Sequence, residues 1–472
     1  MPYVGNTTAD QRHMLDAIGL SSLEELFGDI PSRHRFPELP LAPAATEQEV
    51  IRTLQELGRT NAASGATCFA GGGVYPHFIP TVVDYLSSRG EFATAYTPYQ
   101  AEASQGTLQA GFEYQTMISR LLGMEVVNAS HYDASTAVAE AALMAIRSAR
   151  GNRSRILVLG QLHPQHLEVA QTYLEPINCR IEQISTSSAQ PGGGNQHIHA
   201  DVGAALADDV AALIVQNPDY FGTIRDLSGL SELVHESGAL FVIHTDPIAA
   251  AMLKAPGTYD PDIVTGEGQS LGIPMGFGGP YLGLFATTQK HLRKMPGRII
   301  GQTQDKYGNR GFVLTLNTRE QHIRRSKATS NICTNQALMA LRATIHLAAL
   351  GPQGLLRVAE NCYQNTHYLA SRLADISGCR VANEAAWFRD FILETPLPAE
   401  ELVNHLSAAG IVAGIPLSRY FSGRDNQLLV SATEIHRKRD LDAYAAALTD
   451  AVHASDAAHT SDTMGAAAGG RE

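Results

Sequence analysis

Short, continuous apolar runs alternate with helical patterns between about residues 125 and 330, and this alternation constrains the fold more than any other feature of the chain. The clearest runs have the length of strands and lie at residues 156–160, 211–215 and 240–243. Amphipathic segments of helical length separate them, at residues 136–148, 166–174 and 230–236. Strands that are apolar on both faces occur in mostly parallel sheets with helices on both sides. We therefore expect an α/β large domain whose ligand site lies beyond the carboxyl ends of the strands.

The regions on either side of this pattern differ from it and from each other. Residues 1–70 combine helical signals with a proline-rich stretch, which predicts a helical N-terminal arm ahead of a large domain over residues 71–330. A long Ala/Leu-rich helix is predicted from Asn335 to Leu350, ended by Gly351 and Pro352, within a smaller α+β domain over residues 331–453. Residues 454–472 hold almost no large apolar side chain, so we expect a disordered tail.

Composition excludes several classes of protein. The formal net charge of −12 disfavours a chain that coats nucleic acid or an anionic membrane. No secretory leader or run of about 20 apolar residues is found, and the five cysteines are scattered, which favours a reduced, cytoplasmic protein. The pairs His163/His166 and His197/His199 lack nearby Cys or acidic ligands, so surface or capping roles are favoured over a metal site.

Polar groups follow three of the predicted strands. Residues 128–136 run into a helix start with small hydroxyl residues, Ser135 and Thr136, which could seat a phosphate or simply cap the helix. Asn217 follows a second strand, and Asp246 follows a third, where an acid could bind a pyridinium nitrogen or make a turn. In this order the three groups are typical of pyridoxal-phosphate enzymes with the aspartate-aminotransferase fold, known as fold type I.

Such an enzyme also needs a lysine that binds the cofactor covalently as an aldimine, on a loop about twenty residues after the aspartate. The chain has 35 basic residues, but only six are lysines, and none precedes Lys254. The expected loop, residues 266–280, reads GEGQSLGIPMGFGGP and has Gln269 but no lysine. Because a glutamine amide is not nucleophilic, this loop cannot make the covalent link.

Several long motifs resemble one family closely. The segments are MLDAIGLSSLEELFGDIP (14–31), EFATAYTPYQAEASQGTLQAGFEYQ (91–115), NASHYDAST (128–136), the 266–283 loop, and QHIRRSKATSNICTNQAL (321–338). They resemble subunit 1, the alpha subunit, of the decarboxylating glycine dehydrogenase, which is the two-chain P-protein of the glycine cleavage system. The resemblance runs to about residue 450, and departures such as His131 and Ser270 are minor.

The resemblance implies a division of labour between two chains. The beta subunit holds pyridoxal phosphate on its own lysine, and Gln269 stands at the corresponding position here, so no covalent cofactor is expected. Asp246, Ser135 and Thr136 would be relics with structural duties. The complex, with two alpha and two beta chains, would decarboxylate glycine, release CO2 and pass the aminomethyl group to the lipoyl arm of H-protein.

Two segments are candidates for contact with those partners. Tyr96, Tyr99 and Gln100 carry hydroxyl and amide groups stiffened by Pro98, and they could form one wall of a shared catalytic site. Ordinary packing in the core or at an interface explains the same residues equally well. The basic group Arg324, Arg325 and Lys327 could steer the acidic H-protein, although a solvated basic patch is the simpler interpretation.

Two alternatives to this division remain open. A self-sufficient enzyme could use a displaced lysine, either Lys254 on the helix predicted after Asp246 or Lys327 at the domain junction. A purely structural subunit could instead support the beta subunit or dock H-protein without contributing any side chain to the chemistry.

Overall fold

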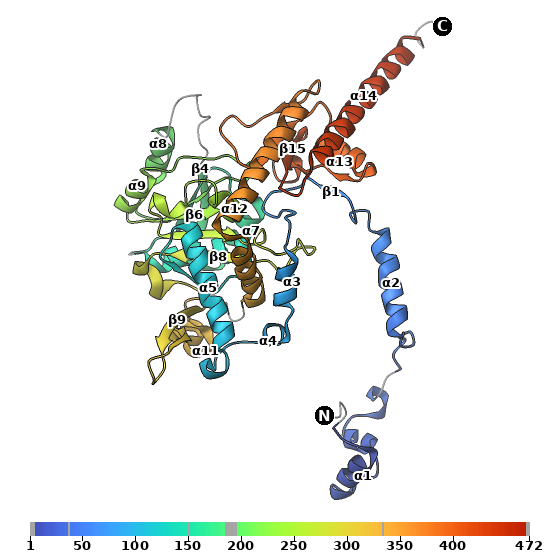
Figure 1. The fold of residues 1–472 in the computed structure, drawn as a ribbon, viewed down its shortest axis with the longest axis vertical. Helices are drawn as coiled ribbons and strands as arrows, with labels where there is room; N and C mark the ends of the chain where they lie inside the picture. The colour runs from blue at the N-terminus through green and yellow to red at the C-terminus, as the bar shows by residue number, and fades with distance from the viewer. Residues whose placement is uncertain (1–4, 36–37, 150, 185–195, 333–334, 469–472) are drawn as a thin grey trace. The chain divides into compact units, whose positions relative to one another are not determined.

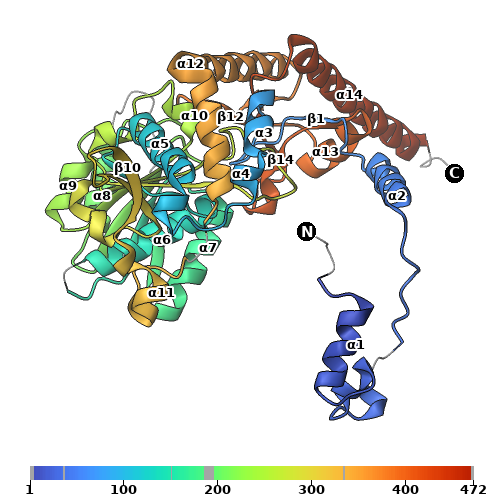
Figure 2. The ribbon, with the colours of Figure 1, turned by 60° about the horizontal axis from the view of Figure 1, so that its bottom comes forward.

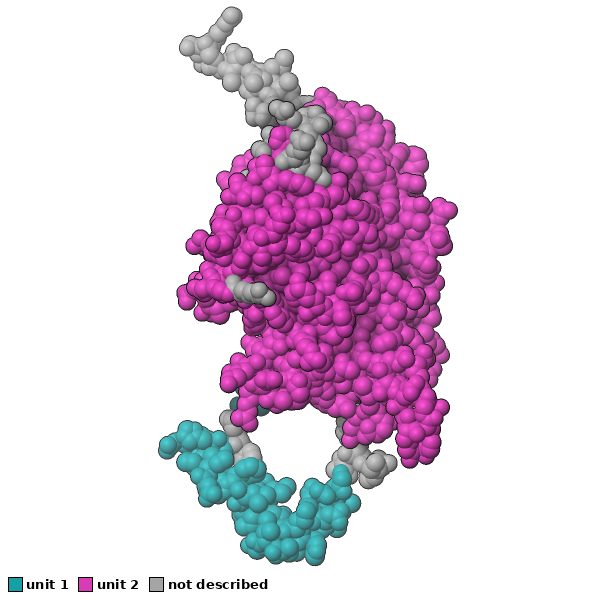
Figure 3. All heavy atoms as spheres, turned by 90° about the vertical axis from the view of Figure 1, so that its left-hand side faces the viewer, with its two compact units in different colours: residues 1–64 teal, residues 65–472 magenta. Residues whose placement is uncertain are grey.

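The computed structural model describes residues 5–35, 38–149, 151–184, 196–332 and 335–468, with only the backbone described for residue 196 and residues 455–468. The chain divides into two units, residues 1–64 and residues 65–472, which are coloured separately in Figure 3. Each unit is described here by itself.

The first unit consists of short helices joined by extended chain. Thr7 caps the first helix through a capping box with Asp10, and Thr46 caps the last through Glu49. No described side chain of these helices is buried. The segment after Ser22 forms a 3-10 helix. The elements are α1 (Thr8–Ala17), η1 (Leu23–Phe27), η2 (Ser32–His34) and α2 (Glu47–Thr60).

A seven-stranded sheet lies at the centre of the second unit, with strand order β2-β8-β7-β6-β5-β3-β4 (Figures 1 and 2). The strands from β7 to β4 are mutually parallel, and only β8 and β2 run antiparallel to their neighbours. The parallel sheet predicted from the apolar runs is therefore present. Its strands are β2 (Val126–Val127), β3 (Arg155–Leu159), β4 (Arg180–Ile184), β5 (Val210–Gln216), β6 (Leu240–Thr245), β7 (Ile263–Glu267) and β8 (Gly283–Thr287).

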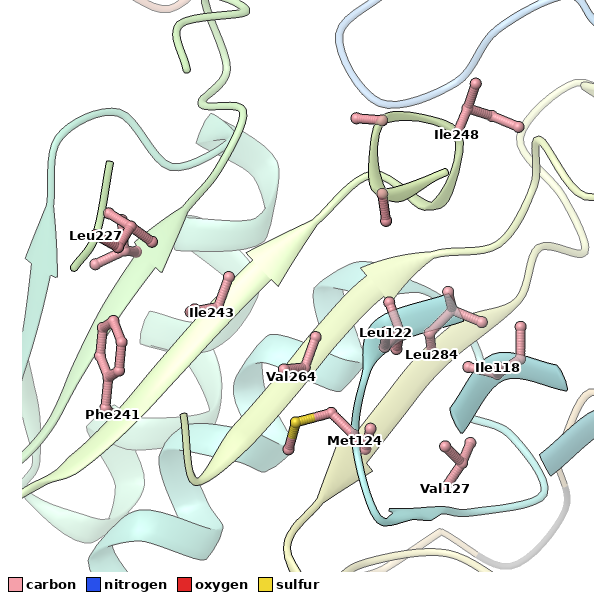
Figure 4. Packing of buried hydrophobic residues seen from close by; sticks show 14 of the residues in the cluster. Ile118, Leu122, Met124, Val127, Leu227, Phe241, Ile243, Ile248, Val264 and Leu284 are labelled. Atoms are coloured by element: carbon pink, nitrogen blue, oxygen red, sulfur yellow. The ribbon is translucent and has the colours of Figure 1, made fainter. Parts of the chain in front are cut away.

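Both faces of this sheet are buried, which explains the continuous apolar runs. Alternate residues of one strand enter different cores: Leu213 packs with helices α5, α9, α10 and α12, whereas Ile214 packs with α6 and α7. Figure 4 shows part of the first core, including Phe241, Val264 and Leu284. The covering helices are α5 (Gln105–Leu122), α6 (Ala134–Ser148), α7 (Pro164–Leu174), α8 (Gln196–Ala205), α9 (Leu230–Glu236), α10 (Pro247–Ala250) and the first half of α12 (Ala337–Ala374).

Smaller elements connect these helices and strands. The hairpin β9–β10 packs its Ile300 and Phe312 with Leu108 of α5. The helix expected to carry Lys254 ends at Ala250, so that lysine lies in the following loop. The elements are α3 (Thr81–Ser87), α4 (Gly90–Ala93), η3 (Ala101–Ala103), η4 (Glu175–Ile177), η5 (Pro256–Tyr259), η6 (Gln289–Lys294), β9 (Ile299–Gln304), β10 (Arg310–Thr315), η7 (Asn317–Arg319), α11 (Gln321–Arg324) and η8 (Arg325–Lys327).

The C-terminal part builds a second core around a four-stranded antiparallel sheet, ordered β11-β12-β15-β14. Helix α12 passes from the first core to this one through a kink at Gly351, whose φ of 64° breaks the helical path where the sequence predicts an end. The elements are β1 (Thr67–Cys68), β11 (Arg380–Val381), β12 (Asp390–Glu394), α13 (Ala399–Ala408), β13 (Ile411–Val412), β14 (Ile415–Pro416), η9 (Leu417–Arg419), β15 (Gln427–Ser431) and α14 (Lys438–Ala468).

Helix α14 extends well beyond residue 453, where the sequence predicts a disordered tail. The tail is rich in alanine, which has the highest helix propensity, so the backbone continues the helix to Ala468 even though little apolar surface is available to bury. Residues 469–472 lie outside the described chain. Across the described residues, none of the helices combines the length and the apolar character that a membrane span requires.

Candidate functional site

Gln269 lies in a buried position after strand β7, with 1% of its surface exposed. Its side-chain nitrogen donates to the carbonyls of Tyr75 (3.1 Å) and Ile273 (2.8 Å), and its oxygen accepts the Tyr75 N–H (3.0 Å). All three polar bonds of the amide go to backbone groups, so Gln269 fastens the segment around Tyr75 to its own loop. A buried amide with this set of partners has a structural role, and we call these three hydrogen bonds the Gln269 clamp.

Asp246 follows strand β6 and begins helix α10. One carboxylate oxygen accepts the N–H groups of Ile248 (2.7 Å) and Ala249 (3.0 Å), and the other forms an ion pair with the fully buried Arg389. Both oxygens are therefore engaged within the protein. The aspartate acts here as a helix cap and as the counter-ion of Arg389.

Arg389 connects this aspartate to the N-terminal part of the second unit. Its guanidinium lies 3.4 Å from the centre of the Tyr75 ring and donates to His77 Nε2 (2.8 Å). His77 Nδ1 in turn donates to Glu434 (2.7 Å), because its other nitrogen accepts from the arginine. Burial opposes ionisation of Glu434, but the hydrogen bonds that it accepts from His77 and from the Phe78 N–H (2.8 Å) hold its pKa at about 2. Asp246, Arg389, His77 and Glu434 thus form one continuous network.

The start of helix α6 is the predicted phosphate seat. Asp133 caps it by accepting the N–H of Thr136 (2.8 Å), and Thr136 returns a bond to the backbone of Asp133. The carboxyl group of Glu267 accepts the N–H of Ala134 (3.0 Å), as well as those of Gln269 (3.0 Å) and Leu282 (3.1 Å). Burial raises the pKa of Glu267 to about 8, although the three N–H donors act in the opposite direction and lower this pKa.

A small cavity remains between these groups. Its volume is about 40 Å³, and its lining includes Tyr75, Asp246, Glu267 and the imidazoles of His163 and His244. Burial lowers the pKa of His163 to about 4 and that of His244 to about 3, so both rings are neutral. The space holds a few water molecules. His163 also caps helix α7 by accepting the N–H of Gln165 (3.1 Å) with Nδ1.

The aromatic candidates Tyr96, Tyr99 and Gln100 lie elsewhere, in the exposed segment between α4 and η3. Tyr96 is 82% exposed and Tyr99 is 52% exposed. Arg298 donates to the Tyr99 hydroxyl (3.2 Å) and carries its guanidinium over the same ring. Tyr96 and Arg298 line a separate cavity of about 200 Å³, which shares no lining residue with the cavity beside Asp246.

The basic candidates are also on the surface. Arg324, Arg325 and Lys327 are exposed around α11 and η8. Lys254 is exposed as well, with its Nζ 4.1 Å from the centre of the Tyr259 ring. Neither Lys254 nor Lys327 lines the cavity beside Asp246.

Known proteins place the chain in one family. A family model described as glycine cleavage system P-protein matches residues 1–448. The chain belongs to the glycine cleavage system P-protein family. A protein of Chlorobium phaeobacteroides, "Probable glycine dehydrogenase (decarboxylating) subunit 1", is 49% identical over 446 residues, which cover 94% of this chain and 98% of the relative. A protein of the same name from Thermomicrobium roseum is 46% identical, with 96% and 100% covered.

Solved structures agree with this family. The crystal structure of a glycine decarboxylase (P-protein) in inhibitor-bound form superposes with a TM-score of 0.85 at 41% identity, covering 96% of this chain and all of the other. An alanine–glyoxylate aminotransferase from Nostoc sp. shares the fold alone, with a TM-score of 0.55 at 15% identity over 90% and 99% of the two chains. The P-protein resemblance and the fold type I prediction are both confirmed.

Pyridoxal phosphate, which this fold implies, does not fit the pocket of this P-protein chain. The loop of residues 266–280 contains no lysine that could make a covalent link, and both oxygens of Asp246 already have partners within the chain. The first turn of α6 already donates to two carboxyl groups, and one of them, Glu267, also lines the cavity that remains beside Asp246. No catalytic step can therefore be assigned to this pocket.

Three residues of the pocket were not found from the sequence. Glu267 was visible only as part of the GEGQ loop, next to the missing lysine. Arg389 and Asp390 stand within an otherwise apolar stretch, Phe388–Leu393, and charges in a buried strand are a usable signal for a paired interior network. Tyr75 donates its hydroxyl to Asp390 (2.8 Å), a contact that joins positions 315 residues apart.

Proposed function

We propose that this chain is the cofactor-free alpha subunit of a two-chain glycine decarboxylase. The observation that carries the proposal is Gln269, which is buried in a loop without a lysine and whose side-chain amide bonds only to backbone groups. The name "subunit 1" of the relatives supports the existence of a partner chain. Stoichiometry of two alpha and two beta chains and a cytoplasmic location belong to the same proposal.

The proposed complex carries out the first step of glycine cleavage. The beta subunit holds pyridoxal phosphate, which supplies the electron sink for loss of CO2 from glycine, and the aminomethyl group passes to the lipoyl arm of H-protein. The alpha chain holds the beta subunit in its active shape and forms one wall of the beta subunit's site. The pocket around Gln269 contributes rigidity rather than chemistry.

The wall that this chain contributes is the segment containing Tyr96, Tyr99 and Gln100. Exposed aromatic side chains with polar tips suit contact with a partner, because they bury large apolar area while keeping a hydrogen bond available. Arg298 holds Tyr99 from behind, since it donates to the hydroxyl and also bonds Glu320 (3.4 Å). The Tyr99 ring is thereby held on a fixed support, three residues after the exposed Tyr96.

Absorbance spectra and an exchange assay test the division of labour. The full chain mixed with pyridoxal phosphate is expected to give no cofactor absorbance and no borohydride-fixed adduct. Together with the beta subunit, it should support glycine–bicarbonate exchange. A stable adduct on Lys254 or Lys327 would instead establish a self-sufficient enzyme, but both lysines are exposed and neither is among the residues that line the Asp246 cavity.

Tyrosine variants separate a shared site from a scaffold. Tyr96→Phe and Tyr99→Phe are expected to lower the exchange rate of an intact complex, whereas Tyr307→Phe, at an exposed position beyond strand β9, serves as the matched control. Unchanged exchange in both test variants, with normal assembly, would favour the purely structural role.

The basic surface is the proposed docking region for H-protein. Reversing the charge of Arg324 and Arg325 should slow aminomethyl transfer at low salt and have less effect at high salt, because exposed charges are screened. Equal rates at both ionic strengths would assign these residues to a solvated patch.

A further inference from the structure

We infer that the carboxyl groups of Glu267 and Asp133 occupy the phosphate seat of helix α6, so that restoring a lysine at position 269 is not sufficient to make this chain take up pyridoxal phosphate. The inference deepens the proposed function, because it explains how the alpha chain leaves the cofactor to its partner. The Glu267 carboxyl group thus takes the position at the start of helix α6 that the phosphate of a cofactor would occupy.

The hydrogen bonds at the helix start carry the argument. A phosphate bound at a helix N-terminus needs the free N–H groups of the first turn. Here the Ala134 N–H donates to Glu267 and the Thr136 N–H donates to Asp133, so those two donors are already used. An incoming phosphate would have to displace both carboxyl groups from these N–H donors.

Glu267 is also held from the other side. Its second oxygen accepts the N–H groups of Gln269 (3.0 Å) and Leu282 (3.1 Å), which lie at the two ends of the loop that would carry the lysine. The Glu267 carboxyl group therefore links the loop after strand β7 to the start of helix α6 through hydrogen bonds. A bound phosphate would make the same link, but as part of a separate molecule. Displacing this carboxyl group would leave three backbone N–H donors without their partner. The binding free energy of the cofactor would have to offset that penalty.

The geometry around the seat leaves no alternative space. The loop backbone at Gly268 is so close to Leu282 that an added Cβ would lie 2.8 Å from its side chain. The remaining cavity of about 40 Å³ lies beside Asp246 and the histidines, and Glu267 itself forms part of its lining. The Glu267 side chain therefore both bonds to the helix start and lines the remaining space.

The first test uses the full chain without the beta subunit, so that its result is independent of the exchange assay. Gln269→Lys is expected to bind pyridoxal phosphate at least tenfold more weakly than Gln269→Lys combined with Glu267→Ala, measured by absorbance and by the mass of the borohydride-fixed adduct. Circular dichroism checks that both variants fold. Equal uptake by the single and double variants would overturn the inference.

A second test avoids the lysine altogether and uses inorganic phosphate as the probe. Phosphate should raise the melting temperature of Glu267→Ala but not that of the natural chain. Glu125→Ala is the matched control, because Glu125 also accepts a backbone N–H, from Gln289 (2.7 Å), but at an exposed position. A phosphate effect that is the same in all three proteins would contradict the proposed seat.

Discussion

The pocket around Gln269 and the segment around Tyr96 differ in how far their side chains are buried and in how many partners those side chains have within the chain. In the pocket, the Gln269 amide is hydrogen-bonded to backbone groups, and Asp246 forms an ion pair with the buried Arg389. Only a small cavity remains beside them. In the segment, Tyr96 and Tyr99 are largely exposed, although they are large aromatic side chains. A region whose polar groups bond mainly to other groups of the chain is suited to a structural role, whereas a region that exposes aromatic surface is suited to a partner.

The largest effect is expected from breaking the buried network. Arg389→Met should lower the free energy of unfolding by about 3 kcal/mol or more, because it leaves Asp246 and His77 without their cationic partner in a buried setting. Chemical denaturation of the full chain measures this change. Arg380→Met is the matched control: its bond to Glu394 (2.7 Å) is on the surface, so a loss under about 1 kcal/mol is expected. Similar losses in the two variants would remove the distinction between pocket and surface.

Removing the clamp should have the next largest effect. Gln269→Ala leaves the N–H and carbonyl of Tyr75 and the carbonyl of Ile273 unpaired, so the free energy of unfolding should fall by about 2 kcal/mol. Gln109→Ala, which removes an exposed amide from helix α5, is expected to change it by no more than about 0.5 kcal/mol. If the two glutamines proved equally dispensable, Gln269 would be a vestige without a structural role.

Glu267 gives the pocket a pH dependence that the exposed segment lacks. Burial raises its pKa to about 8, so between about pH 4.5 and 8 the folded chain binds a proton that the unfolded chain has released. The contribution of Glu267 to stability therefore falls as pH rises through this window, by at most about 1.4 kcal/mol per pH unit. Denaturation of the natural chain and of Glu267→Gln across this range should diverge accordingly, and parallel curves would show that Glu267 is ionised throughout.

The smallest effect on stability is expected in the exposed segment. Tyr96→Ala in the isolated chain should change the free energy of unfolding by no more than about 0.5 kcal/mol, since the side chain is 82% exposed. The same variant should weaken assembly with the beta subunit, as measured by analytical ultracentrifugation. A large loss of stability in the isolated chain, with assembly unchanged, would make Tyr96 a packing residue.

Much of the fold was predictable because it depends on local patterns. The apolar runs predicted strands β3, β5 and β6 because both faces of each strand are buried, and Gly351 marked the break in α12 because it adopts a positive φ. The extended helix α14 was not foreseen, since low hydrophobicity and high helix propensity point in different directions for an alanine-rich segment.

The site was predictable only in part. Gln269 and Asp246 could be found from the order of strand ends, but their partners could not, because Tyr75 and Arg389 are far away in the chain. Glu267 was overlooked for the same reason: its significance depends on the helix start at Ala134, 133 residues earlier. Hydrogen bonds between distant segments have no periodicity in the sequence that would reveal them.

The sequence by itself determined the family, the parallel sheet and the absence of a lysine at position 269, since motifs, apolar runs and residue identity are all properties of the linear chain. Only the tertiary structure determined which side chains fill the pocket around Gln269 in place of a cofactor. Folding brings Glu267 to the start of α6 and Arg389 to Asp246, and at those distances burial and charge give each group a partner within the protein.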